Sequence, residues 1–132
     1  MREIKFRAWD KENEKMLEVA NISFDKEAYG YDLITIDKAK ESPMLWTFNR
    51  LEDFVLMQYA GLKDKNVVEI FEGDIVKSQD GTGGLIYKHI VEWNDFYKGF
   101  DPMRKDASYF NRRGCEIIGN IYENGDLLEV AE

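Results

Sequence analysis

The pattern of short alternating runs broken by turn-forming residues constrains the fold most strongly. Within residues 56–77, three apolar runs are separated by the polar turns 63–66 and 72–74. Alternation between apolar and polar residues with a period of two is typical of strands that have one buried face, and Gly, Asn and Asp are typical of the turns between them. The sequence therefore predicts an all-β fold in which short strands follow one another closely.

The N-terminal part predicts a hairpin followed by further strands. Residues 3–9 and 16–24 read as two strands, and the all-polar segment 10–15 joins them as a turn. Residues 33–36, Leu-Ile-Thr-Ile, predict another short strand. The apolar run 44–48 fits either a strand or irregular structure.

Residues 51–59 are compatible with two kinds of element. Asn49 could cap a helix at this point. A run that is rich in Phe, Val and Tyr and stops at Gly61 is more typical of a buried strand, so we expect a strand.

The remaining part of the chain continues the β pattern. Glycines and Asp80 in 78–84 predict a hairpin loop, and 94–111 is the longest segment without a regular pattern. Strands are expected at 67–71, 75–77, 85–93 and 116–122, with a short apolar turn at 127–128.

Composition indicates a globular protein of the cytoplasm. Hydrophobic residues make up 44% of the 132 residues, which is enough for a core without disulfides. The single cysteine, Cys115, allows no intramolecular disulfide, and no segment has the apolar length of a signal peptide or membrane span. The formal net charge of -8 opposes non-specific binding to phosphate backbones.

Three blocks of sequence, in the right order, carry a resemblance to a known family. Residues 4–10 (IKFRAWD), 56–76 and 117–124 (IIGNIYEN) resemble the opening strand, central block and closing strand of the YopX family of phage and prophage proteins. Three departures stand out: Ala60 replaces the usual Thr, residues 67–68 are Val-Val where Gly-Lys is usual, and residues 125–126 are Gly-Asp where Pro-Glu is usual. The Val-Val pair argues against a glycine-type turn after the preceding asparagine.

The resemblance implies an architecture and a setting. It implies a single domain over 1–132, with an N-terminal β part of about 1–50 and an SH3-like part of about 51–130. In this arrangement an N-terminal hairpin and small sheet pack on an SH3-like β-roll or barrel core. It also implies a phage or prophage origin and a host bacterial cytoplasm. The family has no assigned reaction, so no catalytic residue is carried over.

Nothing in the sequence forms a recognisable catalytic constellation. His89 and Cys115 are each alone of their kind, which leaves no Cys/His zinc site and no Cys–His pair with spare partners. We expect His89 to be a packed or edge residue of a strand. The chain is therefore predicted to be no enzyme and to need neither a cofactor nor a metal.

One enzymatic alternative rests on carboxylates. Glu72, Asp74 and Glu92 would come together if 67–77 pairs with 85–93, and carboxylates can hold Mg²⁺ for phosphoryl transfer. Glu72-Gly73-Asp74 is more simply a turn in which the aspartate side chain binds backbone.

Segment 96–113 is the predicted binding loop, because it mixes aromatic with basic residues. Such residues suit a protein interface, and they also suit a groove that stacks bases and follows phosphates. Covering the open end of a small barrel would use the same aromatic rings. The leading hypothesis is a binding module for a protein partner or for self-assembly into a homo-oligomer, and the alternative is nucleic-acid binding. The candidate residues are Phe96, Tyr97, Lys98, Phe100, Arg104, Lys105, Tyr109, Phe110, Arg112 and Arg113.

Overall fold

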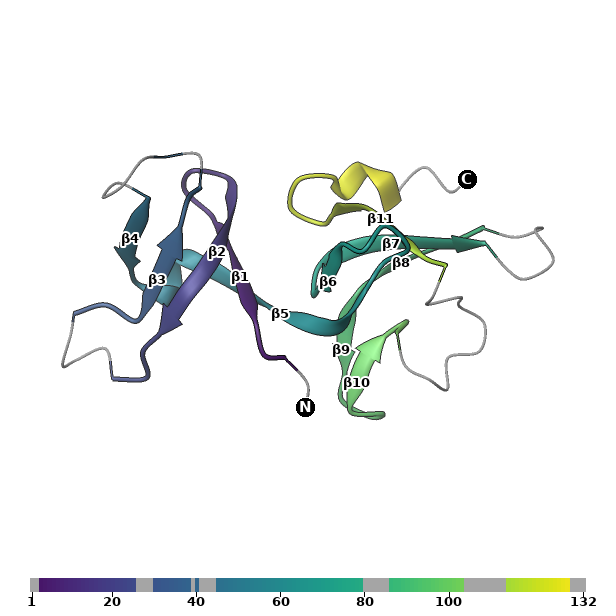
Figure 1. Ribbon diagram of the computed structural model, residues 1–132, viewed down its shortest axis with the longest axis horizontal. Helices are drawn as coiled ribbons and strands as arrows, with labels where there is room; N and C mark the ends of the chain where they lie inside the picture. Colours follow the sequence, from purple (N-terminus) through teal and green to yellow (C-terminus); the bar gives the residue numbers. More distant parts are fainter. Residues whose placement is uncertain are drawn as a thin grey trace. The chain divides into compact units, whose positions relative to one another are not determined.

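The computed structural model shows a chain whose regular structure is almost entirely β (Figure 1), so the predicted all-β class is confirmed. The finer SH3-like arrangement stays a prediction.

The residues described are 3–25, 30–38, 40, 45–79, 86–103 and 114–128. The elements are β1 (Phe6–Asp10), β2 (Lys15–Ile22), β3 (Leu33–Ile36), β4 (Trp46–Asn49), the 3₁₀ turn η1 (Leu51–Asp53), β5 (Phe54–Lys63), β6 (Glu69–Phe71), β7 (Asp74–Gln79), β8 (Ile86–Ile90), β9 (Glu92–Asn94), β10 (Gly99–Asp101), β11 (Glu116–Asn120) and η2 (Gly125–Leu128).

The chain divides into two compact units. The first unit contains Ile4–Gln58, and the second contains Glu3 and the described residues from Tyr59 onward. The first half of β5 pairs with β1, with Phe6 opposite Gln58 at one end of the register. This pairing places the first half of β5 in the first unit.

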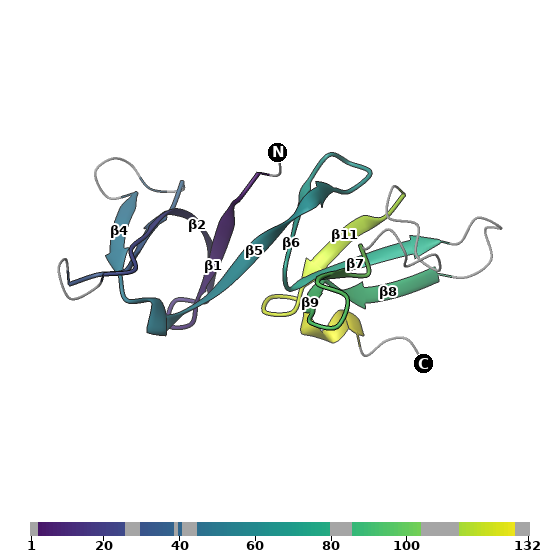
Figure 2. The same ribbon diagram turned by 90° about the horizontal axis from the view of Figure 1, so that it is seen from below.

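The first unit is built on the predicted N-terminal hairpin. Strands β1 and β2 are antiparallel, and Asp10 lies opposite Lys15 at the end of their register. Strand β1 also lies beside β5 (Figure 2). Asp10 orders the hairpin turn, because its Oδ1 accepts the backbone N–H groups of Glu12 (3.0 Å) and Asn13 (3.2 Å). Strands β3 and β4 extend the sheet on the other side of β2. The buried core of this unit contains Ala8, Leu33 and Phe54.

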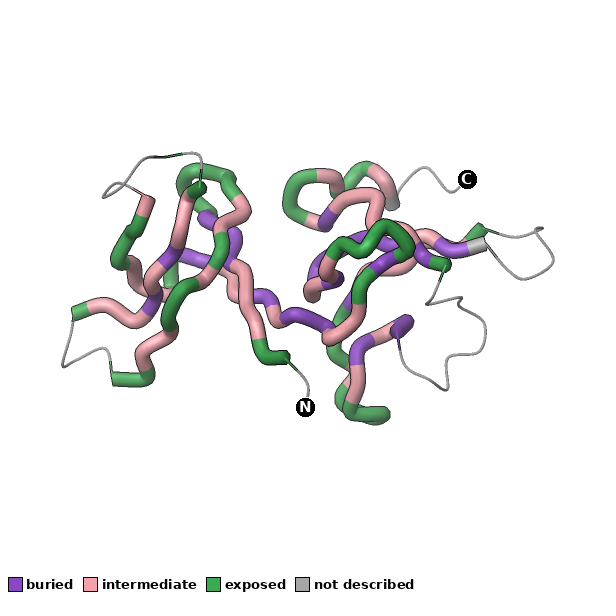
Figure 3. The backbone as a smooth tube through the Cα atoms, in the orientation of Figure 1, coloured by how far each residue is buried: buried purple, intermediate pink, exposed green. Residues whose placement is uncertain are grey.

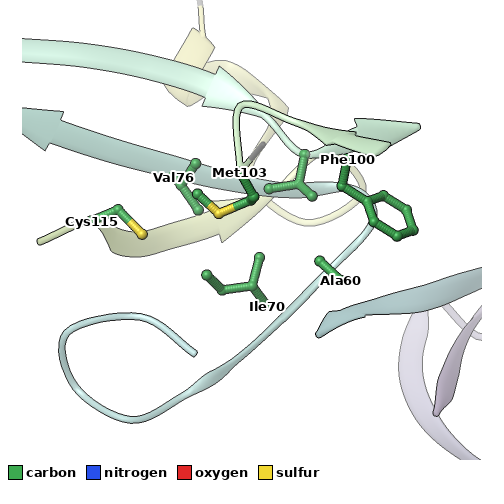
Figure 4. Close-up of a cluster of buried hydrophobic side chains, with 7 residues drawn as sticks. Ala60, Ile70, Val76, Phe100, Met103 and Cys115 are labelled. Atoms are coloured by element: carbon green, nitrogen blue, oxygen red, sulfur yellow. The ribbon is translucent and has the colours of Figure 1, made fainter. Parts of the chain in front are cut away.

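The second unit is organised around β7, which pairs with β8 on one side and with β11 on the other. Apolar residues from several elements, including β10 and the segment that follows it, pack together beside this sheet (Figure 4). Burial of such side chains is the main favourable contribution to folding. The cluster consists of Ala60, Ile70, Val76, Val91, Phe100, Met103 and Cys115.

Asp64 connects the turn after β5 to β11. Its Oδ1 accepts the N–H groups of Asn66 (2.8 Å) and Val68 (3.0 Å), and its Oδ2 accepts the N–H of Ile117 (3.0 Å). Val67 lies between them with a φ of 65°, a left-handed conformation that glycine adopts far more readily. The expectation that the Val-Val pair argues against a glycine-type turn here is therefore wrong, because Val67 itself takes the left-handed conformation.

Two strands begin or end differently from the sequence expectation. The expected strand at 51–59 is confirmed from Phe54, but Leu51–Asp53 forms a 3₁₀ turn, and β5 continues through Gly61 to Lys63. Gly61 has a φ of 89°, and the register with β6 shifts between Tyr59 and Lys63. The glycine therefore marks an irregularity within a strand instead of its end.

The expected long strand at 85–93 is interrupted, and a strand occurs where none was expected. Val91 separates β8 from β9; it is fully buried, and its N–H and C=O bind the backbone of Asp74 and Gly73. Gly99–Asp101 then forms β10, which pairs with β9. The expectation that all of 94–111 is irregular is therefore wrong for this part, while residues 104–111 lie outside the described part of the chain. The expected loop 78–84 is wrong for its first two residues, since β7 reaches Gln79, and residues 80–84 lie outside the described part of the chain.

The closing strand depends on a close approach at Gly119. A Cβ atom at this position would lie 2.6–2.7 Å from the side chain of Asn124. Asn124 is held there because its Oδ1 accepts the N–H of Asn120 (3.2 Å). The glycine thus provides the space that the chain needs as it folds back after β11.

Candidate functional site

The candidate site is the hairpin formed by β9 and β10, hereafter the aromatic hairpin (residues 92–101). Its two strands pair in a simple register with Phe100 opposite Trp93. Asn94 orders the turn, because its Oδ1 accepts the backbone N–H groups of Phe96 (2.9 Å) and Tyr97 (3.1 Å). The Asn94 side chain therefore orders the hairpin tip in the manner of an Asx turn.

Further hydrogen bonds fasten the base of the tip. The N–H of Lys98 binds the C=O of Asn94 (2.8 Å), and Lys98 has a left-handed φ of 57°. The Asn94 Nδ2 group donates to Asp101 Oδ2 (2.8 Å), which links the two strands. A surface loop with this many internal hydrogen bonds loses little conformational entropy when it binds a partner.

Three aromatic side chains of the hairpin are exposed to solvent. The exposed fractions are 84% for Phe96, 54% for Tyr97 and 41% for Trp93, and Figure 3 shows the turn between β9 and β10 as exposed. The Phe96 and Tyr97 rings pack edge to face, with centroids 4.8 Å apart. Trp93 Nε1 donates to Asp95 Oδ1 (2.8 Å), so its polar atom is satisfied while its ring stays accessible.

Phe100 has a different role from the one the sequence suggested. It is only 6% exposed and belongs to the core cluster of the second unit (Figure 4). Its ring contacts Trp93 edge on, at a centroid distance of 5.1 Å. Phe100 therefore anchors the aromatic hairpin to the core and does not contribute to an exposed binding surface.

The structure brings together only part of the predicted site. Phe96, Tyr97 and the exposed Lys98 share the turn of the hairpin. Two further residues belong to the site. Trp93 was predicted only as the end of a strand, and Asn94 orders the turn. The Asn-Asp pair that follows Trp93 was the sequence signal for this turn. Six predicted residues lie outside the described part of the chain, namely Arg104, Lys105, Tyr109, Phe110, Arg112 and Arg113.

The carboxylates proposed for metal-dependent chemistry do not form a cluster. Within the ranges that the structure describes, which include Glu72, Asp74 and Glu92, no group of three or more His, Cys, Asp or Glu side chains could hold a metal ion. Asp74 is 2% exposed, and its Oδ2 accepts the N–H of Phe71 (2.8 Å). It orders the turn before β7, as the simpler interpretation of this segment predicts.

His89 and Cys115 are both held in packed surroundings. His89 stacks on Tyr87 with a centroid distance of 6.4 Å, and burial lowers its pKa while Asp101 opposes that change. Cys115 is fully buried, and burial together with the charge of Asp64 raises its pKa to about 11. A thiol in this state is a core residue and a poor nucleophile at neutral pH.

The fold and the site together define a class: an all-β protein of two compact units that carries an ordered, exposed aromatic hairpin. No helix in the described ranges has both the length and the apolar character needed to cross a membrane.

The chain belongs to the YopX family, since the family described as "YopX protein" matches residues 5–129. The resemblance found in the sequence is thereby confirmed. The crystal structure of protein EF1440 from Enterococcus faecalis is similar, with a TM-score of 0.64, 32% sequence identity, and coverage of 97% of this chain and 99% of that one. No match was found among curated proteins.

Proposed function

We propose that this chain is a non-enzymatic binding module that recognises a protein partner through Trp93, Phe96 and Tyr97 of the aromatic hairpin. The observation that carries the proposal is the exposure of these rings on a turn that Asn94 orders. Aromatic residues are enriched among the anchors of protein interfaces. Burying one such ring contributes about 2–4 kcal/mol.

The charge of the hairpin favours a protein partner over a nucleic acid. Within residues 92–101, Glu92, Asp95 and Asp101 oppose the one basic residue, Lys98, so the local formal charge is 1 − 3 = −2. Together with the net charge of -8, this repels phosphate groups. It suits an apolar pocket with a basic rim, because complementary charge speeds association and excludes wrong partners.

The test is affinity capture of the tagged protein from a lysate of bacteria that express it. A Phe96→Ser/Tyr97→Ser variant removes two of the exposed rings and leaves Asn94 in place. Phe24→Ser is the matched control, since Phe24 is 99% exposed in the first unit. Each capture is repeated after nuclease treatment.

We expect the wild type to capture a protein that stays bound after nuclease treatment. Phe24→Ser should capture the same amount of this protein. The double variant should bind it at least tenfold more weakly, which corresponds to about 1.4 kcal/mol. Equal capture by the double variant would refute the role of the hairpin. Partners that disappear with nuclease would instead support the nucleic-acid alternative.

A further inference from the structure

The outer strand of the first unit is the second surface that the structure singles out. Strand β4 lies at one end of the sheet order β4-β3-β2-β1-β5-β6, and β3 is its one strand neighbour among the residues described. Its sequence, Trp-Thr-Phe-Asn, contains no charge and no proline, and its register with β3 is unbroken. Proteins protect sheet edges by keeping the edge strand very short or by placing charged residues, prolines or bulges in it. β4 is short, with four residues, but it contains no charged residue, no proline and no bulge.

The backbone of β4 presents hydrogen-bonding groups at this edge. The N–H of Asp37 binds the C=O of Leu45 (2.8 Å), so these two residues form a hydrogen-bonded pair at the end of the antiparallel pairing between β3 and β4. Hydrogen-bonded and non-bonded positions alternate along such a pair. Trp46 and Phe48 therefore take non-bonded positions opposite Ile36 and Ile34, with their N–H and C=O groups directed away from β3.

The side chains beside this edge form an apolar platform. Trp46 is 49% exposed and Phe48 is 63% exposed, and their strand partners Ile36 and Ile34 lie on the same face. Figure 3 shows β4 as an exposed segment of the first unit. The ring of Tyr31 packs against Phe48 with a centroid distance of 4.9 Å, which holds the phenylalanine in place.

The opposite face of β4 is occupied by polar contacts within the unit. Asn49 Nδ2 donates to Thr35 Oγ1 (3.0 Å) and to the C=O of Thr47 (3.0 Å). Thr35 is 1% exposed. The polar groups on this face of β4 are thus hydrogen-bonded within the unit. A further strand would be added at the edge of the sheet and would extend the aromatic face.

We propose that β4 pairs with β4 of a second copy of this chain in a symmetric antiparallel dimer. A two-fold axis at Thr47 places Trp46 of one copy opposite Phe48 of the other, twice. In this register Trp46 and Phe48, whose N–H and C=O groups are directed outward, each meet the other residue in the second copy, which gives four backbone hydrogen bonds and two aromatic cross-strand pairs. The absence of charge in β4 means that two chains of net charge -8 meet here without like charges directly opposed.

This dimer is independent of the proposed function, because the aromatic hairpin lies in the other unit. It uses a sheet edge and a second copy, whereas the hairpin is proposed to contact a different protein. A variant of one surface should leave the other unchanged, so the two proposals fail separately.

The test is sedimentation velocity of the full chain from low micromolar to sub-millimolar concentration. The variants are Phe48→Lys, which places a charge at the edge, and Phe48→Pro, which removes an outward N–H without removing a bond to β3. Phe24→Lys is the control for adding a positive charge at an exposed phenylalanine. Circular dichroism verifies that each variant is folded.

We expect a concentration-dependent dimer for the wild type and for Phe24→Lys, and dimerisation weaker by roughly tenfold or more for both Phe48 variants. The Phe96→Ser/Tyr97→Ser variant should dimerise like the wild type. A wild type that stays monomeric throughout, or folded Phe48 variants that dimerise as well as the wild type, would overturn the proposal. If Phe48→Pro unfolds, Phe48→Lys decides the result.

Discussion

Replacing Asp64 with asparagine tests how the second unit holds its turn to its closing strand. Asp64 is 6% exposed, and its carboxylate accepts hydrogen bonds from the backbone N–H groups of Asn66, Val68 and Ile117. The bond to Ile117 spans 53 residues of sequence, so it is a tertiary contact. Asparagine keeps the shape of the side chain and one acceptor oxygen, but it turns an NH₂ group toward the Ile117 N–H.

The expected loss of unfolding free energy follows from replacing the oxygen that faces the Ile117 N–H by an NH₂ group. A hydrogen bond to a charged group contributes about 1.5–3 kcal/mol, and leaving a buried N–H without an acceptor adds its desolvation, so we expect Asp64→Asn to destabilise the protein by about 2–4 kcal/mol. For a chain of this length this corresponds to a fall in Tm of about 10 °C. The exposed Asp126→Asn is the control and should change stability by less than about 0.5 kcal/mol.

The pH dependence provides a second, independent readout. Burial alone would raise the pKa of Asp64, but hydrogen bonds from Ile117, Val68 and Asn66, with help from Lys65, hold that pKa below its ordinary value of 3.8. A lowered pKa in the folded state means that the stabilisation is fully present above about pH 4 and is lost as the pH falls through the folded-state value.

Urea unfolding of Asp64→Asn and wild type at neutral pH and at successively lower pH measures both effects. The difference in unfolding free energy should be constant down to about pH 4 and shrink below it. A difference below about 0.5 kcal/mol at neutral pH is within the range of an ordinary surface substitution, and it would show that the hydrogen bonds of Asp64 do not stabilise the second unit.

Two further predictions follow from the same unit. Val67→Gly should stabilise the protein by about 0.5–1 kcal/mol, because it relieves a left-handed valine whose side chain is 70% exposed; a loss of stability in urea unfolding would contradict this. Cys115, whose pKa is raised to about 11, should react with a thiol reagent at pH 8 only as fast as the protein opens. Labelling as fast in native buffer as in denaturant would contradict a buried thiol.

Local pattern was sufficient to predict most of the strands. Leu33–Ile36 was predicted with the observed bounds, and the β1–β2 hairpin was predicted to within a few residues, because alternation and turn residues are local signals. The structural role of the Glu72-Gly73-Asp74 turn was also predicted, since Asp74 binds a backbone N–H only three residues away.

What the sequence could not provide depends on contacts between distant segments. β10 contains Gly and Asp, which are poor strand formers, and it exists because Asn94 folds the chain back onto β9. Phe100 was assigned to an exposed loop because nothing local distinguishes it from Phe96; its place opposite Trp93 takes it into the core. The role of Asp64 requires Ile117, which lies far along the chain.

Photo-crosslinking in cells tests whether the aromatic hairpin contacts a protein. A photoreactive phenylalanine analogue is placed at Phe96 in one protein and at Phe24 in another, since both side chains are almost fully exposed. We expect a discrete protein adduct from position 96 that is absent from position 24 and resistant to nuclease. No adduct from position 96, the same adducts from both positions, or an adduct with nucleic acid would contradict it.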